Sequence, residues 1–400
     1  MTAKCKHTLK TCVFLIRPPT LGRETIHSAS LLGTQERRGG SRTALTSCKG
    51  SHLTRWVRVC CACNGYRIRS RSFRSRMVRQ LARITLKTGE RMQCLLVKEP
   101  EESWAADVQR LLVHKRDHVH WHIARSIAGP LDALETRFYL GVVGGEAVGN
   151  IMTVEHGGIG ILGHVFTQPN HRRKGIASHI MAAQMRDFRE RSGRVLTLGT
   201  GYDSPPYWIY HSFGFRSIVE GSGAMWYWGQ SEQAADLWRA PITGVASPLW
   251  QHWPLVNLLC IQPDGDLLRL AARRLLGPRN FEGDFTRYKR DLEAEDSTIV
   301  SRVLENEAGL VVGFASLEDD PLWGGAAALL DLLMHPTAWE AAEDLLSAVL
   351  LPSKPIFAYA DMDSPKNDVL LAHGFEQQAS WPDWLPVGGE ARGVNCWLRR

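Results

Sequence analysis

The residues best suited to chemistry lie near the middle of the chain, where a basic turn follows a β-prone run. The turn reads Arg172-Arg173-Lys174-Gly175, and a helical pattern of apolar residues begins at Ile176. The first N–H groups of a helix have no internal partner and lie at the positive end of the helix dipole, so they bind oxyanions. Gly175 lets a ligand approach the backbone closely. The stretch therefore predicts a phosphate-binding turn between a strand and a helix.

Two motifs in this region resemble those of a known family. Arg172-x-x-Gly175-x-Ala177, preceded by Pro169, resembles the acetyl-coenzyme A signature of the GNAT superfamily of N-acetyltransferases. Downstream, Tyr210-His211-Ser212-Phe213-Gly214-Phe215 resembles the Tyr-x-x-x-Gly-Phe motif of the same family. The two motifs stand in the family's order. The alternative is a chance basic helix start followed by an ordinary Gly-Phe turn.

The resemblance implies that acetyl-CoA is the co-substrate and that it binds along one strand and one turn. The strand would pair with the pantetheine through Val165, Phe166 and Thr167, and one of its N–H groups would also stabilise the tetrahedral oxyanion. Thr167 stands where the family more often has valine, although the contact runs through the main chain. The pyrophosphate would be held by the turn and the helix start, which comprise Arg172, Arg173, Lys174, Gly175, Ile176 and Ala177. The alternative for the Arg173 and Lys174 side chains is that they only raise the on-rate.

Two further residues are expected to transfer protons. The resemblance gives Tyr210 the role of protonating the departing thiolate, which a phenol with a pKa of about 10 can do; the alternative is an aromatic that packs on the cofactor. Glu155 is our candidate for the base that takes the amine proton through a water, with His164 and a base-free route as alternatives. No cysteine lies near the motifs, so we expect direct transfer in a ternary complex and no acyl-enzyme.

Basic residues and cysteines are concentrated at the start of the 400-residue chain. Residues 1–91 hold 20 of the 48 Lys and Arg but only three of the 41 acidic residues. Their poor apolar periodicity predicts a disordered basic extension, or translated upstream sequence; a nucleic-acid-binding arm is the alternative. Cys60-Cys61-Ala62-Cys63 has no second ligand pair at zinc-site spacing, so we expect no metal.

The sequence contains neither an apolar run long enough to span a membrane nor a secretory signal pattern. Its cysteines do not form a disulfide framework and suit a reducing compartment. We therefore expect a cytoplasmic location and no membrane partner.

The order of expected elements predicts an α/β (α+β) fold, in which a mixed, mostly antiparallel sheet is flanked by helices. This is the GNAT fold that the resemblance implies, expected at 92–229. Within it we expect strands at 92–97, 138–143, 148–155, 159–167 and 195–199, a helix at 174–191, and closing strands within 215–228. Ser103 is expected to cap a helix that starts at Trp104, and Asp203 one that ends at Tyr210.

The remainder of the chain resembles a second, degenerate GNAT-like domain at 298–400, preceded by a helical linker and the start of that domain at 230–297. Val312-Gly313, Pro336 and Gly374-Phe375 match Val148-Gly149, Pro169 and Gly214-Phe215. The binding chemistry is missing, because Arg172, Gly175, Ala177 and Tyr210 are replaced by Trp339, Ala342, Asp344 and Leu370. An acid at the helix start would repel a pyrophosphate. An unrelated α/β domain is the alternative.

The helical region before the central hairpin is rich in histidine. His114, His118 and His122 are expected on one helical face, as a polar face near the acceptor entrance or as a metal site. We expect the acceptor to be a primary amine on a small molecule or a peptide, and we do not expect nucleic acid as a partner. The alternative function is a non-catalytic acyl-CoA-binding or sensor protein with the same fold.

Overall fold

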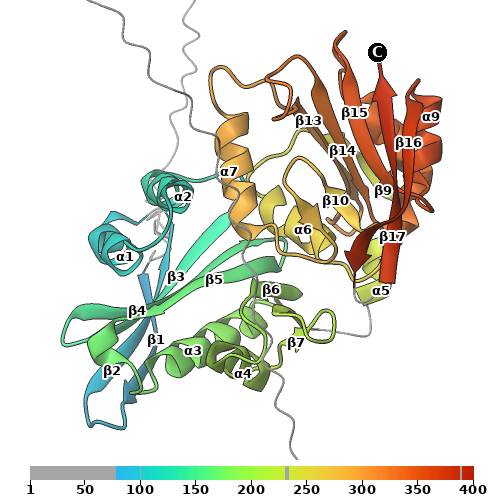
Figure 1. The fold of residues 1–400 in the computed structure, drawn as a ribbon. Helices are drawn as coiled ribbons and strands as arrows, with labels where there is room; N and C mark the ends of the chain where they lie inside the picture. Colours follow the sequence, from blue (N-terminus) through green and yellow to red (C-terminus); the bar gives the residue numbers. More distant parts are fainter. Residues whose placement is uncertain (1–77, 100, 230–233, 388–389) are drawn as a thin grey trace, which may run out of the picture. The chain divides into compact units, whose positions relative to one another are not determined.

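The structure, a computed structural model, describes residues 78–99, 101–229, 234–387 and 390–400 (Figure 1). These residues belong to one compact unit and contain two large sheets and one small hairpin. Residues 1–77, which include most of the basic extension and the Cys60-Cys61-Ala62-Cys63 motif, lie outside the described residues. None of the described helices is both long and apolar enough to cross a lipid bilayer.

The first sheet has eight strands in the order β1-β2-β3-β4-β5-β6-β8-β7. Only β5 and β6 run parallel, because helix α3 crosses between them. The prediction of a mixed, mostly antiparallel sheet flanked by helices is confirmed. The strands are β1 (Val78–Thr85), β2 (Arg91–Lys98), β3 (Glu135–Val143), β4 (Glu146–His156), β5 (Ile159–Thr167), β6 (Val195–Gly199), β7 (Arg216–Ser217) and β8 (Ala224–Trp228).

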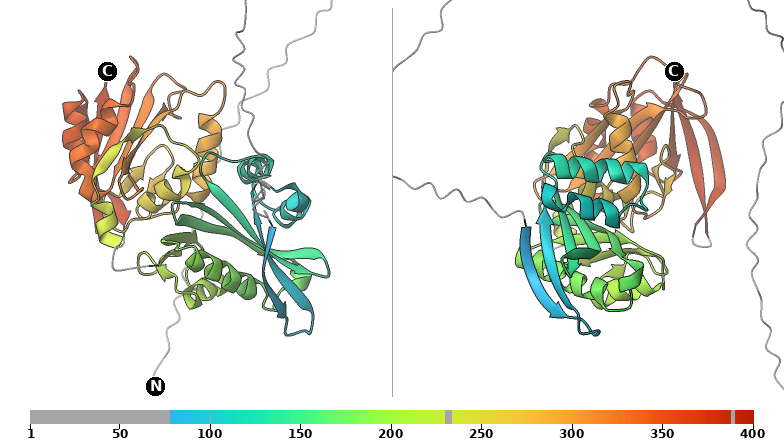
Figure 2. Two further views of the ribbon diagram at one scale, coloured as in Figure 1. Left: turned by 180° about the vertical axis from the view of Figure 1, so that it is seen from behind. Right: turned by 90° about the vertical axis from the view of Figure 1, so that its left-hand side faces the viewer.

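Helices cover both faces of this sheet. Successive residues of a strand point to opposite faces, so the apolar residues of β2 divide between two cores. Met92 and Leu96 pack in the core with α3 (Ile176–Glu190) and α4 (Pro205–Ser212). Leu95 packs in the core with α1 (Ala105–Leu111) and α2 (Asp117–Ala128). Figures 1 and 2 show α3 on one side of the sheet and α1 and α2 on the other.

The second sheet has seven strands in the order β16-β17-β15-β14-β13-β12-β9. Its one parallel pair, β14 and β15, has antiparallel neighbours on both sides, as β5 and β6 have in the first sheet. The strands are β9 (Ile242–Ala246), β12 (Val300–Asn306), β13 (Val311–Asp319), β14 (Ala328–Met334), β15 (Ile356–Asp361), β16 (Glu376–Val387) and β17 (Glu390–Arg399), and the helices after β14 and β15 are α8 (Ala342–Ser347) and α9 (Lys366–Ala372).

The segment between the two sheets contains strands as well as the expected helices. Strand β9 pairs with β12 and so belongs to the second sheet, within the segment predicted to hold a helical linker and the start of the second domain. Every residue of α6 is buried, and α6 packs against β4, β5 and β13, so one apolar core runs through both sheets. The other elements of the segment are α5 (Ala234–Trp238), α6 (His252–Cys260), β10 (Leu268–Leu270), β11 (Leu275–Leu276) and α7 (Glu282–Leu292).

The hairpin strand β10 lies against β14 and β15 at the point where these two strands diverge. The last residues through which β14 and β15 pair are Leu330 and Ala358. Just beyond, the carboxylate of Asp331 accepts hydrogen bonds from the N–H groups of Ala271 and Ala272. Asp361 accepts two more from the N–H groups of residues 267 and 268. Carboxylates that each accept two backbone hydrogen bonds fix this hairpin firmly in the gap between the strands.

Three local predictions need correction. Strand β1 lies within 78–91, which the sequence analysis assigned to the extension; it pairs with β2 along its length, so the folded part begins before residue 92. The helical turn at Glu102–Trp104 is capped by the carboxylate of Glu101, which accepts from the N–H of Ser103, and Ser103 is not the cap. Helix α4 is capped by Ser204, because Asp203 has a left-handed φ of 57° and its carboxylate accepts from Trp208 Nε1 instead.

A buried amide on α6 links the two halves of the fold. Asn257 is fully buried, and its Oδ1 accepts from the N–H of Phe281 at 2.7 Å. Its Nδ2 donates to Thr197 Oγ1 on β6 at 3.0 Å. The start of α7 is thereby held at the end of β6.

We predict that Asn257→Ala lowers the free energy of unfolding by about 1–3 kcal/mol, because the buried N–H of Phe281 loses its acceptor. Urea denaturation followed by circular dichroism measures this. Asn170→Ala removes an exposed amide and should stay within about 0.5 kcal/mol of the wild type. Equal stability of the two variants would contradict a role for Asn257 in holding the halves together.

Candidate active site

The site begins where two parallel strands separate. Strands β5 and β6 pair over only three residue pairs, and the last is Ile161 with Thr197. Beyond that point β5 continues to Thr167 while β6 ends at Gly199. On the β6 side, residues 162–167 therefore have no strand partner among the described residues. An unpaired strand edge of this kind presents main-chain N–H and C=O groups to a ligand.

A bulge in β5 shapes this free edge. Asn150 of β4 pairs with Phe166, but Met152 pairs with Gly163, so β5 has one residue more than β4 over this span. His164 takes a left-handed φ of 51°, and its carbonyl accepts from Asn150 Nδ2 at 3.0 Å. The predicted pantetheine-binding residues, Val165, Phe166 and Thr167, lie between the bulge and the end of β5.

The predicted phosphate-binding turn joins β5 to α3. Arg173 and Gly175 both have left-handed φ values, 63° and 85°, a conformation found in turns whose N–H groups form anion-binding concavities. Helix α3 has no side-chain cap, and its first helical hydrogen bond runs from His179 N to Gly175 O. The N–H groups of residues 176–178 precede that bond. Among the described residues these N–H groups therefore have no capping partner, and their role in binding a phosphate stays a prediction.

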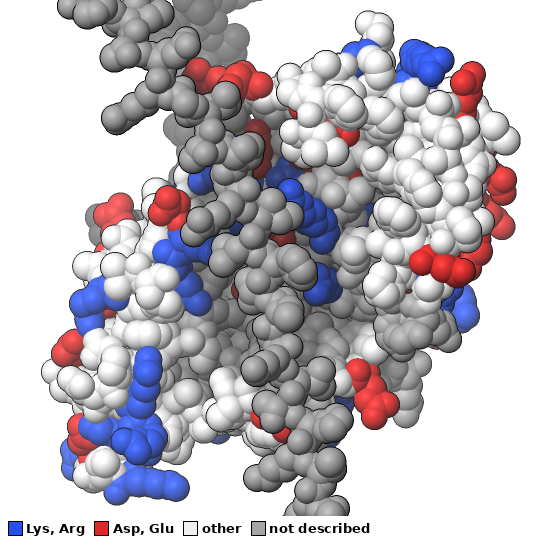
Figure 3. All heavy atoms as spheres, in the orientation of Figure 1, with Lys and Arg blue, Asp and Glu red and all other residues white. Residues whose placement is uncertain are grey.

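The basic side chains of the turn differ in their surroundings. Arg172 donates through Nε to the carbonyl of Thr167 at 3.1 Å, and its guanidinium lies 5.9 Å from the Phe166 ring centre. Lys174 Nζ lies 2.8 Å from a carboxylate oxygen of Glu90, and this hydrogen bond lowers the pKa of Glu90. Arg173 is exposed. The Lys174–Glu90 pair places the turn beside the β1–β2 hairpin, and Figure 3 shows basic side chains gathered at that end of the first sheet.

Tyr210 on α4 is nearly buried, at 8% exposed, and its ring packs 6.2 Å from that of Phe215. Burial raises the pKa of Tyr210 to about 12, and the negative charge of Glu282 adds to the rise. The hydroxyl makes no hydrogen bond to any residue that the structure describes. A phenol in this state is protonated at neutral pH and is free to donate.

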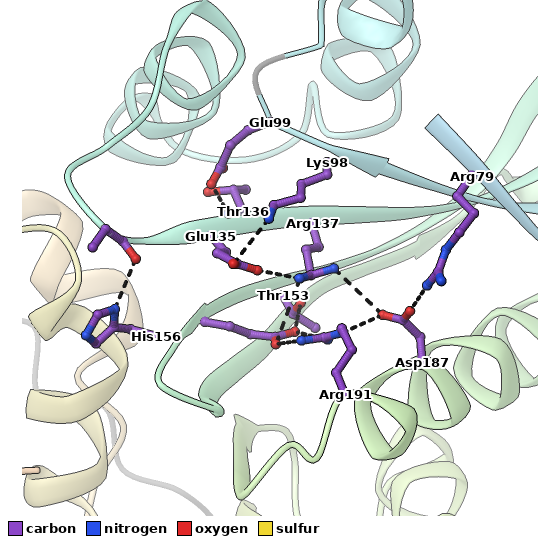
Figure 4. Close-up of polar contacts among 12 residues, drawn as sticks. Arg79, Lys98, Glu99, Glu135, Thr136, Arg137, Thr153, His156, Asp187 and Arg191 are labelled. Atoms are coloured by element: carbon purple, nitrogen blue, oxygen red, sulfur yellow. Dashed lines mark hydrogen bonds and ion pairs between the residues drawn. The ribbon is translucent and has the colours of Figure 1, made fainter. Parts of the chain in front are cut away.

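Glu155 lies deeper in the sheet and is already paired. Its carboxylate is 2% exposed and accepts from Arg191 at 2.8 and 3.1 Å and from Thr153 Oγ1 at 2.6 Å. Figure 4 shows the surrounding Arg137, Thr153, Asp187 and Arg191 side chains. Glu155 lies three residues from Met152, the partner of Gly163, which is about 10 Å along β4. Its role as a base stays a prediction. Glu155 can accept a proton freely only when its hydrogen bonds with Arg191 are broken.

His164 is half-buried, and burial lowers its pKa to about 3, with smaller contributions from Lys115 and three further histidines. At neutral pH its ring is therefore uncharged and binds a proton weakly. The role of His164 as the alternative base stays a prediction.

The histidine face is only partly as predicted. His114 lies in the turn between α1 and α2, where its ring packs 4.7 Å from that of Phe166, so it shares no helix with His118 and His122. His118 and His122 do lie one turn apart on α2. In the part of the chain that the structure describes, no group of three or more His, Cys, Asp or Glu could hold a metal ion.

The residue that sequence reasoning missed is Glu282, in the first turn of α7. A Cβ on Gly163 of β5 would collide with Glu282 Oε1, so the carboxylate occupies the space that a side chain at 163 would take. Its charge also acts on Tyr210. No local signal could have revealed this, because Glu282 lies in the segment expected to be a linker and reaches β5 only through the tertiary fold.

The region that contains the predicted site residues is similar to a known protein family. A family model described as acetyltransferase (GNAT) domain matches residues 135–217, which include β5, the basic turn and Tyr210. A search of curated protein sequences finds no match to this chain.

Three similar solved structures are distant from this chain in sequence. A phosphinothricin acetyltransferase from Sinorhizobium meliloti in complex with AcCoA is 16% identical, with a TM-score of 0.32 over 40% of this chain and 87% of that chain. A putative acetyltransferase from Salmonella typhimurium with acetyl-CoA is 14% identical, with a TM-score of 0.32 over 39% and 92%. A spermidine N-acetyltransferase variant from Vibrio cholerae is 12% identical, with a TM-score of 0.30 over 39% and 93%.

The family model covers both motifs and the strand that feeds the basic turn. Residues 135–217 of this chain therefore match a GNAT acetyltransferase domain.

Proposed function

We propose that this protein is an acetyl-CoA-dependent N-acetyltransferase that moves the acetyl group to a primary amine by direct attack in a ternary complex. One observation carries the proposal: the uncapped start of α3 follows directly on the free edge of β5, in the domain that matches the family. A cofactor with a phosphate end and an amide-containing arm suits that combination of anion site and open strand edge.

The pyrophosphate is assigned to the turn at 172–177. The left-handed residues Arg173 and Gly175 direct N–H groups outward, and the helix dipole adds positive potential. Arg172 is held by the carbonyl of Thr167, so it is positioned beside the turn instead of extending freely into solvent. The basic β1–β2 hairpin adds a longer-range attraction for a polyanionic cofactor.

The pantetheine and the thioester are assigned to the free edge of β5. An N–H group of Val165, Phe166 or Thr167 would hydrogen-bond the oxyanion of the tetrahedral intermediate as it forms. Tyr210 then protonates the departing thiolate. Its pKa keeps the hydroxyl protonated until that step, when the thiolate creates a strong local demand for a proton.

The acceptor class follows from chemistry and from the neighbours' names. The similar structures include enzymes named for phosphinothricin and spermidine, which both carry primary amines. We assign a primary amine, on a small molecule or a peptide, and a cytoplasmic site of action. The test is release of the CoA thiol from acetyl-CoA over a panel that contains both amines and a peptide with a free N-terminus. Tight acetyl-CoA binding with no thiol release from any amine would instead favour the non-catalytic acyl-CoA sensor.

We further propose that residues 298–400 are a degenerate GNAT-like repeat that does not bind the cofactor. The N–H of His335 donates to Val312 O as that of Gln168 donates to Val148 O, and Phe375 N bonds Leu370 O as Phe215 N bonds Tyr210 O. A Cβ on Gly313 would meet Leu345 of α8, just as one on Gly149 would meet Ile176 of α3. These repeated contacts support a common architecture.

The second half lacks both the binding chemistry and the space. Glu343 and Asp344 lie in the first turn of α8, where negative charge repels a pyrophosphate. Strand β10 already lies against the diverging strands β14 and β15, bonded to Asp331 and Asp361. We propose that this hairpin occupies the place that a cofactor would take.

Gly175→Glu should weaken acetyl-CoA binding at least about tenfold, or about 1.4 kcal/mol, because it places a carboxylate where the pyrophosphate is assigned. Isothermal titration calorimetry measures the affinity. Gly309→Glu is the matched control, since Gly309 also has a left-handed φ (72°) and open space around it but lies in the β12–β13 turn. Both variants should lose similar stability, but only the first should lose affinity. Equal affinity would remove the pyrophosphate assignment.

Tyr210→Phe should lower the turnover rate roughly ten- to a thousandfold, about 1.4 to 4 kcal/mol, with acetyl-CoA affinity nearly unchanged. The hydroxyl acts as the C–S bond breaks, so it stabilises the transition state and not bound cofactor. Tyr207→Phe, on the same helix and 7% exposed, is the control and should keep near-normal turnover. A Tyr210→Phe enzyme that loses affinity but not turnover would identify the ring as a packing group.

Calorimetric titration should give one acetyl-CoA per chain. The hairpin at β10 and the acids of α8 leave the second half without a site, so a stoichiometry of two equivalent sites would refute its degeneracy.

A further inference from the structure

Glu282 stands out because three hydrogen bonds of residues 280–282 hold the start of α7 at the end of β6. Its carbonyl accepts from Trp253 Nε1 at 3.1 Å, and the preceding N–H of Phe281 donates to Asn257 at 2.7 Å. One residue earlier, Asn280 Nδ2 donates to the carbonyl of Leu198 on β6 at 3.1 Å. The start of α7 is therefore held at the divergence of β5 and β6, although it belongs to the part of the chain that follows the GNAT domain.

The Glu282 side chain reaches β5, the other of the two diverging strands. Oε1 lies so close to Gly163 that a Cβ there would collide with it. Gly163 lies two residues before Val165, the first residue of the strand edge assigned to the thioester arm. The carboxylate is thus held beside the expected reaction centre by a fixed backbone and not by a flexible loop.

The Glu282 carboxylate has no partner among the described residues, where it makes neither a hydrogen bond nor an ion pair. The groups that interact with its charge are Lys115 before α2 and Tyr210 on α4, and His118 on α2 lies beside the neighbouring Gly283. Lys115 lowers the pKa of Glu282 through its charge but lies beyond ion-pair distance. A half-buried carboxylate without a partner lowers the stability of the fold. A functional role therefore explains its position better than a structural role does.

We propose that Glu282 is the proton acceptor of the transferase reaction, supplied to the GNAT domain by the C-terminal half of the same chain. This inference rests on the proposed function. It assigns to Glu282 the role that sequence reasoning gave to Glu155, whose carboxylate is held by Arg191.

Glu282 and Tyr210 together account for every proton that moves in the reaction. The amine nitrogen attacks the thioester carbon, an N–C bond forms, and the nitrogen proton passes to Glu282. The C–S bond breaks, and the thiolate takes the hydroxyl proton of Tyr210. Glu282 then returns its proton to the Tyr210 phenolate, directly or through water, so an amine and acetyl-CoA give an amide and free CoA thiol with no net proton.

Charge coupling between the two residues favours this order of steps. The Glu282 carboxylate raises the pKa of Tyr210, so neutralising that carboxylate makes Tyr210 a stronger acid at the moment the thiolate leaves. Burial raises the pKa of Glu282 itself to about 7, which suits a base working near neutral pH.

The test compares Glu282→Gln with Asp284→Asn, which removes a charge from the same first turn of α7 where Asp284 pairs with Arg287. With acetyl-CoA and the best amine of the panel, Glu282→Gln should lower kcat/KM by about a hundredfold or more. The wild-type profile of kcat/KM should rise with pH through an inflection near 7, and Glu282→Gln should lose that inflection. Asp284→Asn should keep both the rate and the inflection.

Stability and cofactor affinity separate a proton acceptor from a structural residue. A raised carboxyl pKa means that ionisation is disfavoured in the folded state, so stability falls as pH rises from about 4.5 through about 7. Glu282→Gln should therefore be no less stable than the wild type at pH 8, with unchanged acetyl-CoA affinity by calorimetry.

Three results would overturn the inference while leaving the proposed function intact: turnover by Glu282→Gln within about threefold of wild type, an unchanged inflection, or losses of stability and affinity that match the loss of rate. Failure of wild-type protein to bind acetyl-CoA, or to acetylate any amine of the panel, would instead refute the proposed function, and this inference with it.

Discussion

The separation of the parallel strands β5 and β6 is the constraint on which the rest of the site depends. A parallel pair needs a crossover helix, so α3 must begin near the end of β5 and carry its uncapped N–H groups there. Because β6 stops pairing with β5 at Thr197, β5 keeps an unpaired edge next to that helix start. An uncapped helix start and an open strand edge are thus produced together by one topological feature. Tyr210 reaches the same place because α4 follows directly on β6.

The second sheet has the same parallel pair with the opposite outcome. Strands β14 and β15 also separate after three residue pairs, but Asp331 and Asp361 bind the backbone of the β10 hairpin at the gap. Among the described residues, the corresponding gap of the first sheet receives the start of α7, which brings a carboxylate and leaves the edge of β5 unpaired. The difference between the open gap and the filled one therefore lies in the connecting segment, not in the sheets.

That connecting segment also makes the two halves interdependent. Helix α6 is buried on all sides and shares one apolar core with both sheets, so neither sheet has a complete core without it. Asn257 on α6 joins β6 to the start of α7. The position of Glu282 beside Gly163 is a consequence of this packing. The part of the chain after the family match thereby contributes a side chain beside β5.

The sequence by itself determined the local parts of this protein. Alternating apolar residues predicted the central hairpin and β5, and Arg172, Gly175 and Tyr210 stand at spacings that predicted an anion-binding turn and a second motif, because local structure is set by neighbours in the chain. The boundary of β1, the strands within 230–297 and the surroundings of Glu155 were decided only by the tertiary structure. Glu282 is the clearest case. Strand pairing and burial bring together residues distant in sequence, so only the folded chain could place its carboxylate against Gly163.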